Sequence, residues 1–338
     1  MKSYEKVMGI DVSKKKLHLS LFDGAKHRQY QIENDISSME EFLKQHPEED
    51  FSHILFVMES TGVYHLRIAL FLAKDLSYQV SVVNPLVIKK YAEMLLKRTK
   101  TDKVDARLIA QYGYHNSPPP FLVRDQESYE LDQLLKGIED LQLQMVTLKN
   151  QIEALTHQPY INQLMLTTYQ EVLSQLKKKV KELEKEVKKI IANYAPQEFL
   201  LLKSIPGIGD RVAAALLAML NRFEYFDNVK EVCSFCGLSP GSYQSGETVK
   251  KKRGIVKKGN RYLRKMLYVA ALSASRYNTD GKRLYQRLLS KGKPKKVALV
   301  AVANKLLRQA SAVVKSGIPY DPHYLEKKMD LLLILLDF

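Results

Sequence analysis

The first third of the chain consists of short apolar runs separated by polar turns. The runs predict strands over residues 6–11, 17–22, 27–32, 53–58 and 79–83, and wider apolar spacings predict helices near 38–45, 62–75, 86–96 and 103–114. The early strands follow one another in hairpin order, whereas helices are interleaved later. We therefore expect an α/β layer fold around a mixed sheet. A run of three prolines at 118–120 cannot continue a helix and marks a linker or domain boundary.

A heptad pattern occupies the middle of the chain. Apolar residues alternate spacings of three and four from Leu131 to Leu155 and again from Leu166 to Ile190, with a break around 157–160. Each run exceeds three heptads, which predicts two α-helical arms with coiled-coil packing. The pattern leaves open whether the arms fold on each other or pair with a second chain. Pro196 closes the second arm.

The remaining third is mostly helical by pattern, with a polar loop expected from Ser239 to Asn260. Residues 205–209, Ile-Pro-Gly-Ile-Gly, predict a tight turn of the helix-hairpin-helix type, because Gly207 and Gly209 let the backbone turn sharply. Backbone amides that open the next helix would suit a phosphate, although a purely structural turn is an equal alternative. The expected domains are 1–117, 118–196 and 197–320, followed by a tail at 321–338.

The charge of the chain points to a polyanionic partner. The net charge is +16 and the isoelectric point is near 9.5. Between Glu247 and Lys296 seventeen Lys and Arg residues face only two acids, so most of the excess lies in one stretch. Nucleic acid is the expected partner, and binding should weaken steeply with salt. The predicted contacts are Lys250, Lys251, Lys252, Arg253, Lys257, Lys258, Arg261 and Arg264.

Other features bear on location and on metal binding. No cleavable leader and no run of 18 apolar residues is found, so we expect neither secretion nor a membrane partner, and a cytoplasmic protein associated with the nucleoid. Cys233 and Cys236 form a lone C-x-x-C step without a second ligand pair. Buried, reduced thiols are therefore expected there rather than a zinc site.

Four acidic residues are candidate metal ligands. Asp11 and Glu59 each end an apolar run, and Asp102 and Asp105 lie three apart at the start of a predicted helix. Carboxylates at strand ends and an i, i+3 pair on a helix can converge on one point, as Mg²⁺ requires. Two such ions about 4 Å apart can activate a nucleophile and stabilise a leaving oxygen in phosphodiester chemistry. The alternative is that these are solvated loop acids and acids at a helix N-terminus.

Ser245 is a candidate nucleophile in the basic loop. It precedes Gly246, and four consecutive basic residues follow at 250–253. A hydroxyl beside cations can attack a phosphorus centre, because the cations stabilise charge on the phosphoryl oxygens. Taken alone this signal is weak, since serines in polar loops are common and no His lies close in sequence.

The order of these parts resembles the DEDD transposases of the insertion sequence 110 family, the bridge-RNA-guided recombinases, over nearly the whole chain. The acidic motifs resemble the RuvC-like metal centre of that family, residues 205–209 resemble the opening of its C-terminal transposase domain, and the segment around Ser245 resembles the one with its nucleophilic serine. The matching segments are 9–13, 59–62, 100–106, 205–209, 237–240, 245–246 and 259–264.

This resemblance implies an N-terminal domain of the RNase H/RuvC fold and a C-terminal domain with a catalytic serine. Asp11, Glu59, Asp102 and Asp105 would hold Mg²⁺, and Ser245 would form a covalent phosphoserine link to DNA. The resemblance further implies a noncoding bridge RNA that pairs with donor and target DNA. It also implies a homo-oligomer, a dimer or tetramer, in which the carboxylates of one subunit meet the serine of another.

The sequence allows alternatives for the nucleophilic serine and for the class of activity. A Gln-Ser-Gly-Glu step stands at 244–247 where many relatives have a turn richer in Ser and Gly, so Ser242 is the alternative nucleophile. The residues alone also fit a Holliday-junction resolvase or metal nuclease that uses water, or a dimeric nucleic-acid-binding scaffold without catalysis. The nuclease would leave free DNA ends, and the scaffold would not cut.

Overall fold

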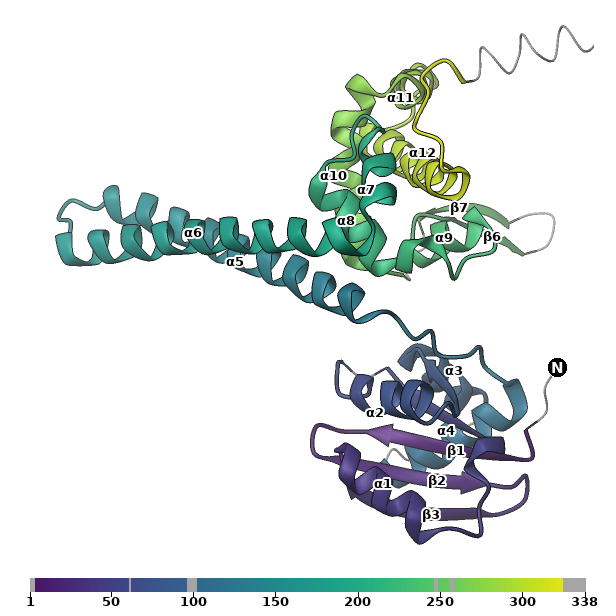
Figure 1. Ribbon diagram of the computed structural model, residues 1–338. Coiled ribbons are helices and arrows are strands. Elements are labelled where there is room, and N and C mark those ends of the chain that lie inside the picture. The colour runs from purple at the N-terminus through teal and green to yellow at the C-terminus, as the bar shows by residue number, and fades with distance from the viewer. Residues whose placement is uncertain (1–3, 61, 96–101, 246–248, 256–258, 325–338) are drawn as a thin grey trace, which may run out of the picture. The chain divides into compact units, whose positions relative to one another are not determined.

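The computed structural model describes residues 4–60, 62–95, 102–245, 249–255 and 259–324, and within 240–258 only the backbone of the described residues. The chain divides between Val123 and Arg124 into two compact units, each with its own core (Figure 1).

The N-terminal unit is built on a five-stranded mixed sheet. The strands are β1 (Lys6–Val12), β2 (Lys16–Phe22), β3 (His27–Glu33), β4 (Ile54–Glu59) and β5 (Gln79–Val83), in the order β3-β2-β1-β4-β5. Neighbours β1, β2 and β3 are antiparallel, whereas β4 is parallel to β1 and β5 is parallel to β4. The mixed sheet predicted from the apolar runs is confirmed, and its order is compatible with an RNase H-like domain.

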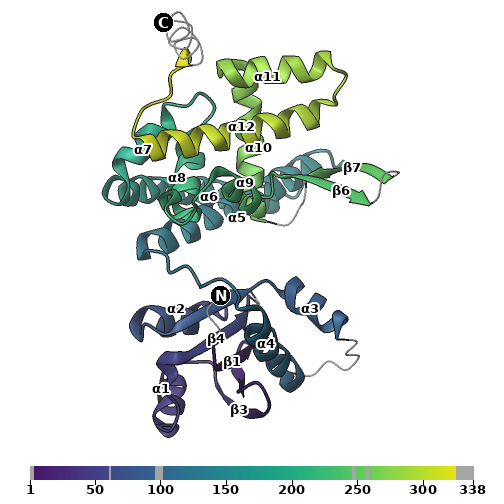
Figure 2. The ribbon, with the colours of Figure 1, turned by 90° about the vertical axis from the view of Figure 1, so that its right-hand side faces the viewer.

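Helices cover both faces of this sheet because alternate residues of its central strands are apolar on both sides. Met8, Ile10 and Phe56 pack on one face with helices α1 (Ile36–Gln45) and α2 (Leu66–Leu70). Val7, Leu55 and Val57 pack on the other with α3 (Pro85–Met94) and α4 (Asp102–Asn116). Figure 2 shows strands of the sheet between these two pairs of helices. A 3₁₀ turn, Phe51–His53, precedes β4, and α2 continues as a π-helix, Phe71–Asp75.

The proline-rich segment after α4 stays attached to the N-terminal unit. The Phe121 N–H donates to the Val80 carbonyl oxygen at 2.7 Å, and the Ser81 hydroxyl donates to the Pro119 carbonyl oxygen at 2.5 Å. The segment therefore ends α4, as predicted, and then runs along the edge strand β5.

The second unit begins with two long helices, α5 (Gln126–Thr156) and α6 (Gln163–Tyr194), which lie side by side as an arm (Figure 1). Heptad residues of both helices, including Leu131, Ile138, Val180 and Val187, are buried in one core. The arms thus fold on each other within one chain, which the pattern alone left open. Coiled-coil packing in the strict sense stays a prediction.

A helical core completes the second unit. Its helices are α7 (Pro196–Lys203), α8 (Asp210–Met219), a 3₁₀ turn (Asn221–Phe223), α9 (Val229–Phe235), α10 (Arg261–Tyr277), α11 (Thr279–Ser290) and α12 (Lys295–Ser316). Helix α8 is central, because every residue from Val212 to Met219 is buried. Within the described part of the chain, α12 alone is long and apolar enough to cross a membrane, and half of that stretch is buried in this core.

The prediction of a polar loop at 239–260 is wrong over most of its length. It contains a two-stranded antiparallel sheet, β6 (Pro240–Ser245) and β7 (Val249–Ile255). The polar and basic side chains hid this hairpin from a pattern search, because the segment lacks the apolar alternation that marks a half-buried strand. Backbone pairing between neighbouring strands overrides the composition here.

Candidate active site

Asp11 and Glu59 lie next to each other at one end of the N-terminal sheet. Strands β1 and β4 are parallel neighbours, and their register pairs Ile10 with Met58. The following residues, Asp11 and Glu59, therefore occupy adjacent positions at the carboxyl ends of the two strands, where sites of α/β sheets commonly lie. Both residues are partly buried.

The two carboxylates also share one face of the sheet. Side chains alternate along a strand, so Asp11 lies on the face of Val7 and Gly9, and Glu59 lies on the face of Leu55 and Val57. Val7, Leu55 and Val57 pack together against α3 and α4. Asp11 and Glu59 consequently lie on the sheet face that α4 covers, at the carboxyl ends of β1 and β4.

Helix α4 brings Asp105 to the same region. An ideal Cβ built on Gly9 would lie 2.3 Å from the Ala106 carbonyl oxygen and 2.3 Å from the Ala110 nitrogen. Only a glycine permits this approach of the helix to the strand. Because Gly9 lies two residues before Asp11 and Ala106 directly follows Asp105, the three acidic residues belong to one neighbourhood.

The fourth predicted ligand, Asp102, opens α4 one helical turn before Asp105, but its side chain lies outside the described residues. Among the side chains that the structure describes, no three His, Cys, Asp or Glu residues are grouped closely enough to hold a metal ion. The donor set itself consists of carboxylate oxygens, which suit Mg²⁺. The fold thus brings Asp11, Glu59 and Asp105 to one region, and a closed four-carboxylate centre stays a prediction.

His18 flanks this region and was missed by the sequence analysis. It is the Cα partner of Asp11 across the β1–β2 pair, so both side chains lie on the same face of the sheet. The His18 Nε2–H donates to Gln31 Oε1 at 3.1 Å, and Nδ1 is buried without a hydrogen-bond partner among the described residues. A cavity of about 210 Å³ adjoins His18, Gln31 and Ala106. Strand alternation could have indicated this position only if the β1–β2 register had been known.

Ser245 lies in the second unit, at the end of β6. It pairs with Val249 across the hairpin, whereas Ser242, the alternative nucleophile, pairs with Lys252. The predicted contacts Lys250, Lys251, Lys252 and Arg253 follow one another along β7. The side chains of residues 240–258 lie outside the described part, as do Lys257 and Lys258 altogether. The backbone therefore places Ser245 in the last residue pair before the connection of a hairpin whose second strand is strongly basic.

The last two predicted contacts, Arg261 and Arg264, differ in exposure on α10. Asn260 caps this helix by accepting from the Leu263 N–H at 3.0 Å, and Arg261 follows it in the first turn, exposed to solvent. Arg264 is partly buried, and its Nη1 is buried without a hydrogen-bond partner among the described residues. Arg261 is thus the more accessible of the two.

Cys233 and Cys236 are buried free thiols, as predicted. Burial raises the pKa of Cys236 to about 12, so this thiol is protonated at neutral pH.

The turn at 204–209 joins α7 to α8. Gly207 has φ +107°, and a Cβ there would lie 2.7 Å from the Ala274 Cβ, so the turn packs directly on α10. Helix α8 opens with Asp210, which pairs with Lys203 at 2.6 Å and with Lys188 at 3.1 Å. The hydrogen bond from Lys203 is the main cause that lowers the pKa of Asp210. A carboxylate thus occupies the first turn of α8, and the choice between a phosphate-binding turn and a purely structural turn stays untested.

Comparison with known proteins covers both units. Residues 8–161 match the DEDD model of IS110 elements, described as a transposase, and residues 200–286 match the model described as the transposase IS116/IS110/IS902 family. The pilin gene-inverting proteins of Moraxella lacunata and Moraxella bovis are each 32% identical over 276 residues, which cover 80% of this chain and 83% of theirs. The transposase of insertion sequence element IS1111A from Coxiella burnetii is 25% identical over 280 residues, 74% of each chain.

Proposed function

Because this chain belongs to the IS110 family of transposases, we propose that it cuts and rejoins DNA with Mg²⁺ held by four carboxylates and a serine as nucleophile. One observation carries the metal part of the proposal. Asp11 and Glu59 end adjacent parallel strands on the face over which α4, packed on Gly9, carries Asp105.

The carboxylate groups would act together. Asp11 and Glu59 would hold the ion from the strand ends, and Asp102 and Asp105 would hold it from the first turns of α4. Mg²⁺ bound there would withdraw charge from the phosphoryl oxygens of the scissile phosphate and stabilise the leaving oxygen. Because Asp11 and Glu59 extend from neighbouring paired strands, binding an ion there would require little reorganisation of β1 and β4.

Ser245 would carry the covalent step. Its oxygen forms a bond to phosphorus and loses its proton, while the bond between that phosphorus and one deoxyribose oxygen breaks and the released oxygen takes up a proton. The phosphodiester energy is thereby retained for rejoining. A relative named a pilin gene-inverting protein supports rejoining, because inverting a gene requires cut strands to be joined again. The basic strand β7 supports phosphate binding beside Ser245.

We further propose that a noncoding bridge RNA selects the DNA sites and that the active form is a dimer or tetramer. Lysine and arginine contacts to phosphate hold a nucleic acid without reading its sequence. Site choice would then follow from base pairing with the RNA. Changing a pairing loop of the RNA should redirect cutting to the complementary DNA, and unchanged cutting sites would contradict RNA guidance.

Substitution of the strand-end carboxylates tests the metal part directly. Asp11→Asn and Glu59→Gln keep the size of each side chain, and each should slow strand cleavage by roughly 10³-fold while DNA binding persists. Calorimetric titration with Mn²⁺ should show weakened ion binding in both variants. Glu33→Gln is a matched control, because Glu33 is an exposed carboxylate at the end of β3. Cleavage at the normal rate by Asp11→Asn would contradict the metal assignment.

A further inference from the structure

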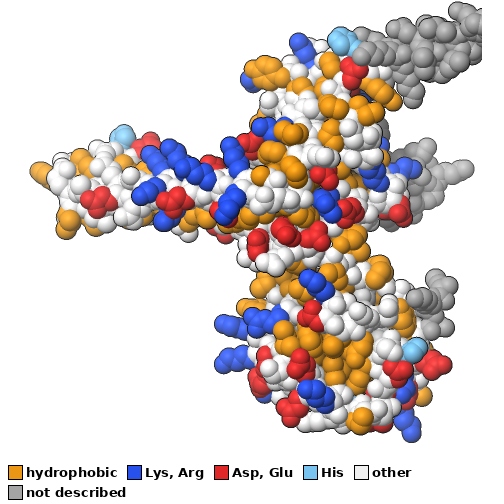
Figure 3. Space-filling model, viewed as in Figure 1, with side chains coloured by type: hydrophobic (Ala, Val, Ile, Leu, Met, Phe, Trp, Pro, Cys, Tyr) orange, Lys and Arg blue, Asp and Glu red, His pale blue; other side chains and the backbone are white. Residues whose placement is uncertain are grey.

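Helix α6 carries a continuous face of lysines. Helical residues advance by 100°, and five lysines fall within about 100° of the helix circumference, away from the buried heptad residues. All five are exposed, and Figure 3 shows Lys and Arg side chains gathered along the arm. We call this face the lysine stripe; it consists of Lys177, Lys178, Lys181, Lys185 and Lys188.

None of the described stripe lysines forms an ion pair with α5. Between the α5 and α6 helices the structure shows no ion pair among its described residues, although α5 is rich in acids; Asp132 pairs with Lys136 and Glu139 pairs with Lys265 instead. The other lysines of α6 in this region, Lys179 and Lys189, pair with glutamates of their own helix. Of the stripe, Lys188 alone makes an ion pair in the described part of the chain.

The five lysines outnumber the two glutamates beside them, Glu182 and Glu184, and Glu184 is hydrogen-bonded to Arg211. Lys177 and Lys181, Lys181 and Lys185, and Lys185 and Lys188 stand three or four residues apart, where like charges repel. An excess of one charge along a helix face attracts a partner of the opposite charge. The stripe is therefore better explained as a binding surface for a polyanion than as a surface that contacts only water.

The geometry of the stripe indicates which polyanion. From Lys177 to Lys188 the helix rises about 16 Å, and duplex DNA carries about ten phosphate charges over that length. No aromatic residue occurs in α6 from Lys177 to Lys188. Single-stranded nucleic acids, in contrast, are commonly held by stacking of their bases on aromatic rings. We infer that the lysine stripe binds the phosphate backbone of duplex DNA, independently of sequence.

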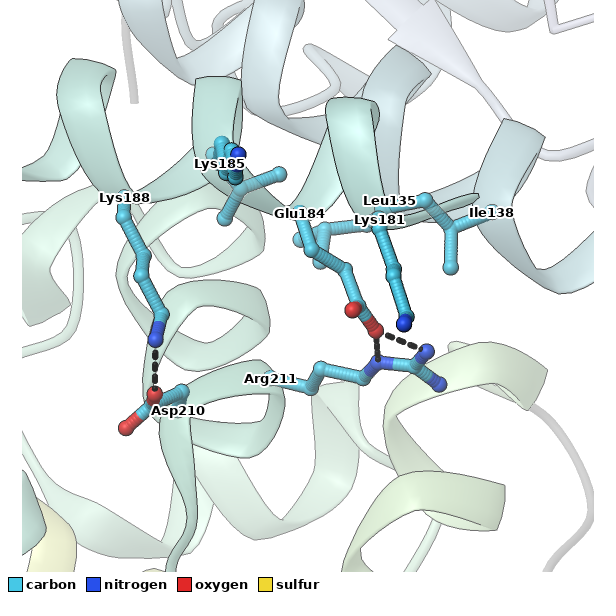
Figure 4. Close-up of a pocket in the computed structure, with 9 residues that line it drawn as sticks. Leu135, Ile138, Lys181, Glu184, Lys185, Lys188, Asp210 and Arg211 are labelled. Atoms are coloured by element: carbon cyan, nitrogen blue, oxygen red, sulfur yellow. Dashed lines mark hydrogen bonds and ion pairs between the residues drawn. The ribbon is translucent and has the colours of Figure 1, made fainter. Parts of the chain in front are cut away.

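The stripe continues into a hollow next to the core of the second unit. Lys181, Lys185 and Lys188 border a cavity of about 330 Å³ together with Arg211 of α8 (Figure 4). Arg211 is fixed by hydrogen bonds to Glu184 and to Gln142 Oε1, the latter at 2.8 Å. Glu184 and Asp210 also line this hollow and pair with Arg211 and Lys188, respectively. Among the described residues, the unpaired charge there therefore comes from Lys181 and Lys185 of the stripe.

A charge-removal variant tests this inference on the full-length protein. The test variant is Lys177→Gln, Lys178→Gln, Lys181→Gln and Lys185→Gln, which spares the Lys188–Asp210 pair. The control removes the same number of charges elsewhere in the second unit, at exposed lysines outside the stripe: Lys136→Gln, Lys149→Gln, Lys179→Gln and Lys230→Gln. Fluorescence anisotropy measures binding to a random duplex of about 30 base pairs across a salt series, for DNA and for RNA of the same sequence.

The two variants should separate clearly. For duplex DNA, the slope of log K against log salt should fall by about 2 to 4 in the stripe variant, and affinity at about 0.1 M salt should fall about a hundredfold or more, whereas the control should change little. Arginine at the same four positions should restore binding, and circular dichroism should show undiminished helix content. An unchanged DNA slope in the stripe variant overturns the inference, as does a loss confined to duplex RNA. The inference depends on the DNA partner of the family and not on the carboxylates or Ser245, so an Asp11→Asn background leaves the expected binding unchanged.

Discussion

Gly9 of β1 and Ala106 of α4 are in direct backbone contact. A Cβ on Gly9 would lie 2.3 Å from the Ala106 carbonyl oxygen, closer than real Cβ contacts come. This contact lets α4 lie on β1 and carries Asp105 toward the strand end where Asp11 stands. The glycine two residues before Asp11 is therefore part of how the fold assembles the candidate metal ligands.

Gly9→Ala should force α4 away from β1. We expect a loss of unfolding free energy of about 1–3 kcal/mol from overpacking, measured by denaturant titration, and slower cleavage because Asp105 moves with its helix. Gly137→Ala in α5 is the control. Nothing lies within 4 Å of a Cβ there, so the helix should gain about 0.5–1 kcal/mol. Wild-type stability of Gly9→Ala would disprove the tight contact.

Glu49 should make the stability of the N-terminal unit depend on pH. Its side chain is only 4% exposed and pairs with Lys6 at 2.6 Å and with Arg28. Burial alone raises the pKa of Glu49, but the hydrogen bonds from Lys6 and Arg28 outweigh it and the net pKa is lowered. A lowered folded-state pKa stabilises the fold above the unfolded value near 4.3 and loses this contribution as the pH falls further.

Glu49→Gln should therefore flatten the decline of unfolding free energy below about pH 4.3. At neutral pH the substitution should cost about 1–2 kcal/mol, because Lys6 and Arg28 are partly exposed and can return to water. Glu40→Gln removes an exposed carboxylate of α1 and should leave the pH profile as in the wild type. Identical acid profiles for wild type and Glu49→Gln would show that the ion pairs contribute nothing.

The basic strand β7 should bind nucleic acid through charge alone. Replacing Lys250, Lys251, Lys252 and Arg253 with Ala should weaken binding of every duplex alike and reduce the salt slope by about 1 for each lost phosphate contact. Anisotropy titrations with two unrelated DNA sequences measure both effects. A variant that loses only one of the two sequences would indicate base contacts rather than phosphate contacts.

Sequence patterns predicted the N-terminal sheet well because its central strands are buried on both faces. Such strands appear as continuous apolar runs, as in 54–58, and polar turns separate them clearly. The hairpin β6–β7 was missed because its strands are polar and basic. The pairing of α5 with α6 could not be read either, since heptads indicate an apolar seam but do not identify the partner helix.

Of the candidate site, the sequence predicted those residues that directly follow a recognisable strand. Asp11 and Glu59 follow apolar runs, so their place at the sheet edge was foreseeable. His18 was not, because its position beside Asp11 depends on the register of the β1–β2 pair. The ion pairs of Asp210 at the start of α8 were also not predicted. Its partners, Lys188 and Lys203, belong to other helices, and their approach depends on how the helices pack.

Mapping the covalent protein–DNA adduct shows whether Ser245 is the nucleophile. Trapped reactions with Mg²⁺ and DNA carrying the element ends are denatured, digested and examined by tandem mass spectrometry. We expect a nucleotide on Ser245, absent from Ser245→Ala and from reactions without divalent ions, and present in Ser242→Ala. An adduct on Ser242 would identify Ser242, and not Ser245, as the nucleophile. Cut DNA with free ends and no adduct on any serine would contradict the account and identify a nuclease that uses water.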